Sequence, residues 1–60
     1  MITISHFSQN PDGVSFEKDA DAIAYMRDVM DYRDDEIDHV LDHLAEAPVV
    51  HLGGWRFSAA

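Results

Sequence analysis

The sequence contains no cysteine, so neither disulfide bonds nor a thiolate metal site can stabilise the fold. It also has few basic residues, with four Lys and Arg against twelve Asp and Glu, and its formal net charge is −8. That charge repels nucleic acid, anionic membranes and acidic ligands. We therefore expect no direct contact with nucleic acid or membrane, and a partner with a basic surface.

Long apolar runs are missing as well. No stretch approaches the roughly 20 apolar residues that cross a bilayer, and the N-terminus lacks the pattern of a signal peptide. The chain nevertheless has 47% hydrophobic residues in its 60 positions, which favours one folded, soluble domain over residues 1–60. So short a domain leaves little room for a catalytic cleft, and with no cysteine a reducing, cytoplasmic compartment fits. We expect a protein that is not an enzyme.

Two short strands are predicted at the N-terminus. Residues 2–7 alternate, with Ile2, Ile4 and His6 on one side. The segment from Asn10 to Gly13 matches a type I turn, with Pro at its second position and Gly at its fourth. Residues 2–7 are thus expected to form a short edge or hairpin strand, and Val14 and Phe16 lie in a second short strand.

The middle of the chain changes to a helical period. A first helix is expected from Asp19, which serves as its N-cap, and its apolar stripe contains Ala22, Ile23, Met26, Val29 and Met30. After a break at residues 32–34, Asp34 is the expected N-cap of a second helix. Its apolar positions are Ile37, Val40, Leu41, Leu44 and Ala45, and it should end before Pro48.

The C-terminal segment predicts a hairpin, residues 49–52 and 55–58, joined by a two-residue Gly53-Gly54 turn. In this register Leu52 faces Trp55 and Val50 faces Phe57, so these four side chains point to the core side. The order is ββααββ. We predict an α+β fold in which two amphipathic helices pack on one face of a small antiparallel sheet.

The surface left after subtracting the core positions is acidic. Asp35, Asp38 and Asp42 form a row along the second helix, although like charges at this spacing destabilise a helix slightly. Such a row on neighbouring helices resembles the field of a phosphate backbone, which carries one charge per roughly 3.4 Å of each strand. A merely solvated acidic face is the alternative. The predicted partner-binding residues are Asp21, Asp28, Asp31, Asp34, Asp35, Glu36, Asp38, Asp42 and Glu46, with Tyr25 and Tyr32 as aromatic contacts beside the first helix.

Several segments together resemble a known group of proteins. They are the initial Met-Ile-Thr-Ile, the turn at residues 10–13, the helix segment 34–43 and the closing Gly-Gly-Trp-Arg-Phe at 53–57. With these, the whole chain resembles the small phage-encoded anti-CRISPR proteins that inhibit type I-C systems. That group shares no sequence motif, so no catalytic residue is transferred. The resemblance implies a non-enzymatic protein in the bacterial cytoplasm that binds the crRNA-guided surveillance complex and blocks its access to target DNA.

The sequence contains features of two other types of site. His39 and His43 are four residues apart, with Asp35, Asp42 and His51 as further candidate metal ligands, but the chain lacks an HExxH frame. We expect no metal and no cofactor. A helix-turn-helix DNA-binding protein is rejected, because its recognition helix would bring carboxylates against phosphates.

The expected function is therefore inhibition of a type I surveillance complex by a monomeric DNA mimic. The alternative is an acidic adaptor or antitoxin-like module that neutralises a basic protein partner.

Overall fold

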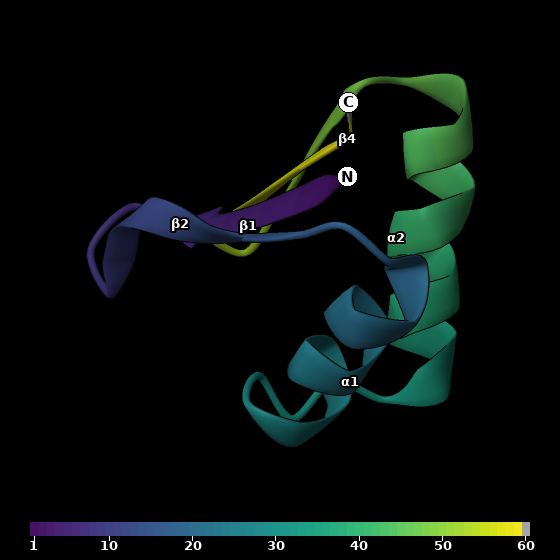
Figure 1. The fold of residues 1–60 in the computed structure, drawn as a ribbon, viewed down its shortest axis with the longest axis horizontal. Coiled ribbons are helices and arrows are strands. Elements are labelled where there is room, and N and C mark those ends of the chain that lie inside the picture. The colour runs from purple at the N-terminus through teal and green to yellow at the C-terminus, as the bar shows by residue number, and fades with distance from the viewer. Residues whose placement is uncertain (60) are drawn as a thin grey trace.

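The computed structural model describes residues 1–59 and has the predicted α+β architecture in the order ββααββ. The strands are β1 (Ile2–His6), β2 (Asn10–Phe16), β3 (Val49–Leu52) and β4 (Trp55–Ala59), and the helices are α1 (Asp19–Asp28) and α2 (Asp34–Glu46). The antiparallel sheet has the order β2-β1-β4-β3, so the N-terminal and C-terminal strands are the central pair. Figure 1 shows the sheet nearly edge-on, with both helices on one of its faces.

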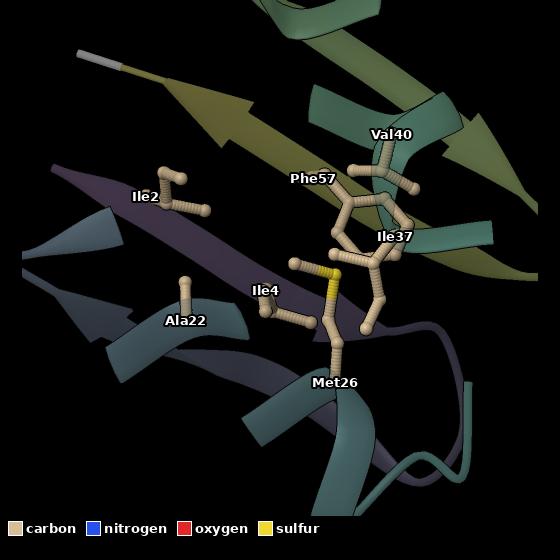
Figure 2. Packing of buried hydrophobic residues seen from close by; sticks show 7 residues of the cluster. All are labelled: Ile2, Ile4, Ala22, Met26, Ile37, Val40 and Phe57. Atoms are coloured by element: carbon tan, nitrogen blue, oxygen red, sulfur yellow. The ribbon is translucent and has the colours of Figure 1, made fainter. Parts of the chain in front are cut away.

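The core lies between this sheet face and the helices. Ile2, Ile4 and Phe57 come from the two central strands, Ala22 and Met26 from α1, and Ile37 and Val40 from α2 (Figure 2). Phe57 is the largest fully buried side chain, and it lies directly across from Ile4 in the β1–β4 register. Alternation along each strand thus sends one set of side chains into the core, as expected for a sheet covered on one face.

The opposite face of the sheet is open and polar. Thr3, Ser15 and Ser58 lie side by side across three strands, and the Thr3 and Ser15 hydroxyl oxygens are 2.9 Å apart. Arg56 and His51 are paired on the same face. The C-terminal hairpin therefore has the predicted register, with Val50 opposite Phe57 and Leu52 opposite Trp55. Gly53 and Gly54 have φ of 57° and 86°, the positive values that a tight two-residue hairpin turn requires.

The predicted turn at residues 10–13 is wrong. The chain turns earlier, over residues 7–9, and Asn10–Phe16 is one strand. The buried His6 explains the shift, because its Nδ1 accepts hydrogen bonds from the backbone N–H groups of Ser8 (3.2 Å) and Gln9 (3.1 Å). The first strand accordingly ends at His6 and leaves Phe7 in the turn.

The Asn-Pro-Asp-Gly segment instead forms an irregularity in β2. Ile4 pairs with Val14 and His6 pairs with Asn10, so residues 11–13 bulge opposite Ser5. Pro11 has no N–H to donate, which is tolerated because β2 is an edge strand. Gly13, at φ 80°, supplies the left-handed conformation that lets the bulge return to regular pairing.

The helix boundaries differ from the predicted ones by one residue at each start. The N-caps are Lys18 and Arg33, and Asp19 and Asp34 are the first helical residues. Their carboxylates still lie at the positive end of the helix dipole. Helix α2 ends at Glu46, before Pro48, as predicted.

Two predicted core positions are also wrong. Val29 lies beyond the end of α1 and is 64% exposed, and Ala45 is exposed on α2. Both sit at the margin of an apolar stripe, where a helical period alone does not decide whether a neighbouring element covers the side chain. The rest of the stripes lies in or against the core.

Gly13 and Gly53 offer a matched test of the bulge. A Cβ on Gly13 would lie 3.1 Å from both the Ile4 carbonyl oxygen and Ser5 Cβ, whereas a Cβ on Gly53 would meet nothing within 4 Å. Both positions have positive φ, which costs a residue with a side chain about 1–2 kcal/mol. We expect Gly13→Ala to lower the free energy of unfolding, measured in urea, by more than Gly53→Ala does. An equal or smaller loss at Gly13 would contradict the close packing of the bulge against β1.

Candidate acidic binding surface

Helix α2 positions the acidic row by burying its opposite side. Ile37 and Val40 are buried against the sheet, and with about 100° of rotation per residue this turns Asp35, Asp38 and Asp42 outward. These three side chains fall within about 60° of one another around the axis and span about 10 Å along it. All three residues are exposed. We call Asp35, Asp38 and Asp42 the α2 acidic row.

Helix α1 neutralises a different carboxylate. The Arg27 guanidinium donates a hydrogen bond to Asp34 Oδ1 at 2.9 Å, and the two side chains form a salt bridge between α1 and α2. Both side chains are largely exposed, at 56% and 82%, so the pair contributes little to stability. Its effect is on the surface charge, because Asp34 is compensated while the α2 acidic row has no basic partner in the described part of the chain.

Glu36 has a local structural role. Its Oε1 accepts the backbone N–H of the N-cap residue Arg33 at 3.1 Å, which satisfies a donor that the helix cannot use itself. The residue is also half-buried. Of the predicted partner-binding acids on α2, Glu36 is thus the one already engaged in holding the helix start.

The acids of α1 do not continue the α2 row. A groove between the helices is lined by Ile23 and Arg27 of α1 together with Asp34, Ile37, Asp38 and Leu41 of α2. Asp21 and Asp28 share one side of α1, and helical geometry turns them about 100–160° away from Ile23 and Arg27. They therefore lie on the side of α1 facing away from α2.

The two remaining predicted acids lie at the ends of the helical segments. Asp31 follows α1 with φ 57°, a left-handed conformation that Asp tolerates better than most residues, and Glu46 is the last residue of α2. Both are exposed. By helical spacing Glu46 lies one turn beyond Asp42 on the same side of α2. The acids of α1, Asp31 and the acids of α2 thus form separate groups, and the α2 acidic row is the most compact of them.

Tyr25 and Tyr32 are only partly available as contact residues. The Tyr25 ring packs on Phe16 with centroids 5.2 Å apart, and Tyr32 lies 6.2 Å from Phe57. Both are half-buried against the core. Burial, and then the negative charge of Glu36, raise the pKa of the Tyr32 hydroxyl above its usual value of 10.0.

The His39 and His43 rings of α2 lie next to each other, with centroids 4.1 Å apart and planes tilted by 41°. His51, a further candidate ligand from the sequence, lies on the open face of the sheet and so on the opposite side of the sheet from α2. No group of three or more His, Cys, Asp or Glu side chains among residues 1–59 is arranged to hold a metal ion.

A second surface feature was not anticipated from the sequence. A depression of about 480 Å³ at the turn end of the sheet is lined by Ser5, His6, Phe7, Pro11, His51, Leu52, Gly53, Gly54, Trp55 and Arg56. Phe7 is 78% exposed and stacks on His6, whose ring also meets Trp55 edge-on. No carboxylate lines this depression, so the molecule has an acidic helical side and a sheet side that carries Arg56 and His51.

Comparison with protein-family models, with curated proteins and with solved structures finds no match to this chain. Among residues 1–59, neither helix has both the length and the apolar character needed to span a membrane.

Tyr32 gives a testable alkaline transition. Because its folded-state pKa is raised, the folded protein holds this proton more tightly than the unfolded chain, and the resulting stability is present below pH 10. It should be lost as the pH rises above 10 through the folded-state pKa. We expect Tyr32→Phe to reduce the fall in unfolding free energy between pH 9 and pH 11. In the Tyr25→Phe variant Tyr32 is the one remaining tyrosine, so the tyrosinate absorbance measured against pH reports its ionisation. A titration midpoint at or below pH 10 would contradict the burial of the Tyr32 hydroxyl.

Proposed function

We propose that the protein is an inhibitor of a type I CRISPR surveillance complex and that it acts as a DNA mimic through the α2 acidic row. The observation that carries the proposal is the position of Asp35, Asp38 and Asp42 on an outward-facing helix side, where none of them has a salt-bridge partner among residues 1–59. Charges on a preformed helix need no backbone ordering on binding, and they steer a basic partner from a distance.

The position of the row supports a contact with a DNA-binding groove. Its three carboxylates span about 10 Å, and Glu46 extends the acidic surface by a further turn. A groove lined with Lys and Arg binds DNA phosphates, which lie about 3.4 Å apart along each strand. The carboxylates of the α2 acidic row have the same negative charge at a wider spacing. Occupying that groove would exclude target DNA by competition, which requires no catalytic residue in the inhibitor.

The unfavourable energetics of the row also support a functional role. Like charges at i, i+3 and i+4 spacing cost a few tenths of a kcal/mol per pair, and α2 has no Lys or Arg to offset them. Arg27 lies at the neighbouring helix and pairs with Asp34 instead. Solubility alone does not require three uncompensated carboxylates on adjacent turns of one helix.

The decisive variant replaces Asp35, Asp38 and Asp42 together by Asn. The fold should survive with stability unchanged or slightly higher, because no core residue is touched and repulsion is removed. We expect binding to a purified type I-C surveillance complex to weaken at least tenfold, through both the association rate and the affinity.

The chain provides a control with the same change in net charge. Replacing Asp21, Asp28 and Asp31 together by Asn also removes three exposed charges. Two of these lie on the side of α1 away from α2, and Asp31 lies three residues beyond the end of α1. Asn tolerates the left-handed conformation at position 31. This control should bind nearly as the native protein does. Equal weakening by both triple variants would show a general charge effect, and full binding by the α2 variant would end the mimic proposal.

Ionic strength provides an independent test. Because exposed carboxylates supply the attraction, raising salt from about 50 mM to about 500 mM shortens the screening length and should slow association with the complex by at least tenfold. The isolated protein should become slightly more stable over the same range, as its own repulsion is screened. Surface plasmon resonance and thermal melting measure the two effects, and salt-independent association would indicate an apolar interface instead.

A further inference from the structure

The histidine pair of α2 has a geometry that its spacing alone does not fix. His39 and His43 lie one helical turn apart, both exposed, with ring centroids 4.1 Å apart and planes tilted by 41°. Two imidazole nitrogens bound to one tetrahedral ion, each at about 2.0–2.1 Å, are roughly 3.3 Å apart. A centroid separation of 4.1 Å is compatible with this distance between the nitrogens, so rotation of the side chains would form the arrangement without a change in the helix backbone.

A hydrogen bond fixes which nitrogen of His43 is available. His43 Nδ1 lies 2.8 Å from the backbone carbonyl oxygen of His39. A carbonyl oxygen only accepts, so Nδ1 carries the proton and the lone pair of the neutral ring is on Nε2. This is the arrangement by which metal-binding histidines are commonly oriented, with the second ring nitrogen donating to a backbone carbonyl or a carboxylate.

The surroundings favour a cation. Asp42 is adjacent to His43 in the sequence, Asp35 precedes His39 by one turn, and none of the four cationic Lys and Arg side chains of the chain lies on α2. We propose that His39 and His43 chelate one divalent transition-metal ion of borderline softness, such as Cu²⁺, Ni²⁺ or Zn²⁺. Water completes the coordination, because residues 1–59 place no third ligand at the pair.

The chemistry sets the order of affinity. Imidazole nitrogens prefer Cu²⁺ to Ni²⁺ and Zn²⁺, whereas Mg²⁺ and Ca²⁺ require oxygen ligands. The second histidine binds intramolecularly once the first holds the ion, so the pair should bind about 100-fold more tightly than either imidazole alone. Binding requires the helical turn, which the unfolded chain lacks, so the ion should also raise the melting temperature.

The test is a calorimetric titration of the full chain with NiCl₂, ZnCl₂ and MgCl₂, accompanied by thermal melting. We expect saturation at one Ni²⁺ or Zn²⁺ per chain, a raised melting temperature and no response to Mg²⁺. Both effects should be lost in His39→Ala and in His43→Ala, which change only exposed side chains.

His51→Ala is the matched control, because it removes an exposed histidine from the open face of the sheet and leaves α2 intact. It should bind as the native protein does. Equal loss of metal binding in His51→Ala and His43→Ala, or a response with no saturation at one ion per chain, would overturn the proposal.

Long-range ¹H–¹⁵N spectra of the metal-free protein at alkaline pH should show His43 protonated at Nδ1, and Zn²⁺ should shift its Nε2 resonance. A His43 protonated at Nε2 would contradict the geometry on which the site rests.

Discussion

The structure depends on a core that only one face of the sheet can provide. Ile4 and Phe57 are fully buried opposite each other in the two central strands, and these strands come from the two ends of the chain. The two helices cover these side chains, and β2 and β3 extend the sheet by pairing with the central strands. The two helices lie over this face because their apolar stripes contain Met26, Ile37 and Val40, which pack in the same buried cluster as Ile4 and Phe57 (Figure 2). In a chain without cysteine this packing carries the stabilisation that small domains otherwise obtain from disulfides or metals.

This one-sided core also determines where the charge lies. The helices use one stripe each for the core, so their carboxylates must point to solvent, while the uncovered sheet face carries hydroxyl groups, His51 and Arg56. The acidic residues are therefore concentrated on the helical side of the molecule. Within that side Arg27 compensates Asp34 and leaves the α2 acidic row as the most compact group of unneutralised charge.

The fold was predictable from the sequence where a hydrophobic period or a turn sequence is compatible with one local structure only. The helical period of α2, the stop before Pro48 and the Gly53-Gly54 hairpin with its register are of this kind, and the structure has all of them. The first hairpin was not, because local propensity favours a turn at Asn-Pro-Asp-Gly, whereas the structure places these residues in a strand with a bulge. The choice depends on His6, whose ring nitrogen captures the N–H groups of Ser8 and Gln9 and turns the chain earlier. The local sequence does not show that the His6 ring is buried and that its Nδ1 accepts these hydrogen bonds, so the earlier turn could not be predicted from it.

The candidate surface was predictable residue by residue but not in its grouping. Helical spacing correctly indicates that Asp35, Asp38 and Asp42 share a side of α2. Which side of α1 faces α2 depends on the tertiary packing of Ile23 and Arg27, and this packing directs Asp21 and Asp28 away from the α2 row. The same holds for Tyr25 and Tyr32, whose rings lie partly against Phe16 and Phe57.

The central claim is that the α2 acidic row, and not acidity in general, contacts the partner. Carboxyl footprinting tests it directly: free protein and protein bound to a crRNA-loaded type I-C surveillance complex are labelled with a water-soluble carbodiimide and an amine, and modification at each Asp is read by mass spectrometry. All the carboxylates compared are exposed in the free protein, so their initial labelling is comparable. The account predicts strong protection of Asp35, Asp38 and Asp42 in the complex, with Asp21 and Asp28 labelled as before. Unchanged labelling of the α2 acidic row in a complex that has demonstrably formed would contradict it.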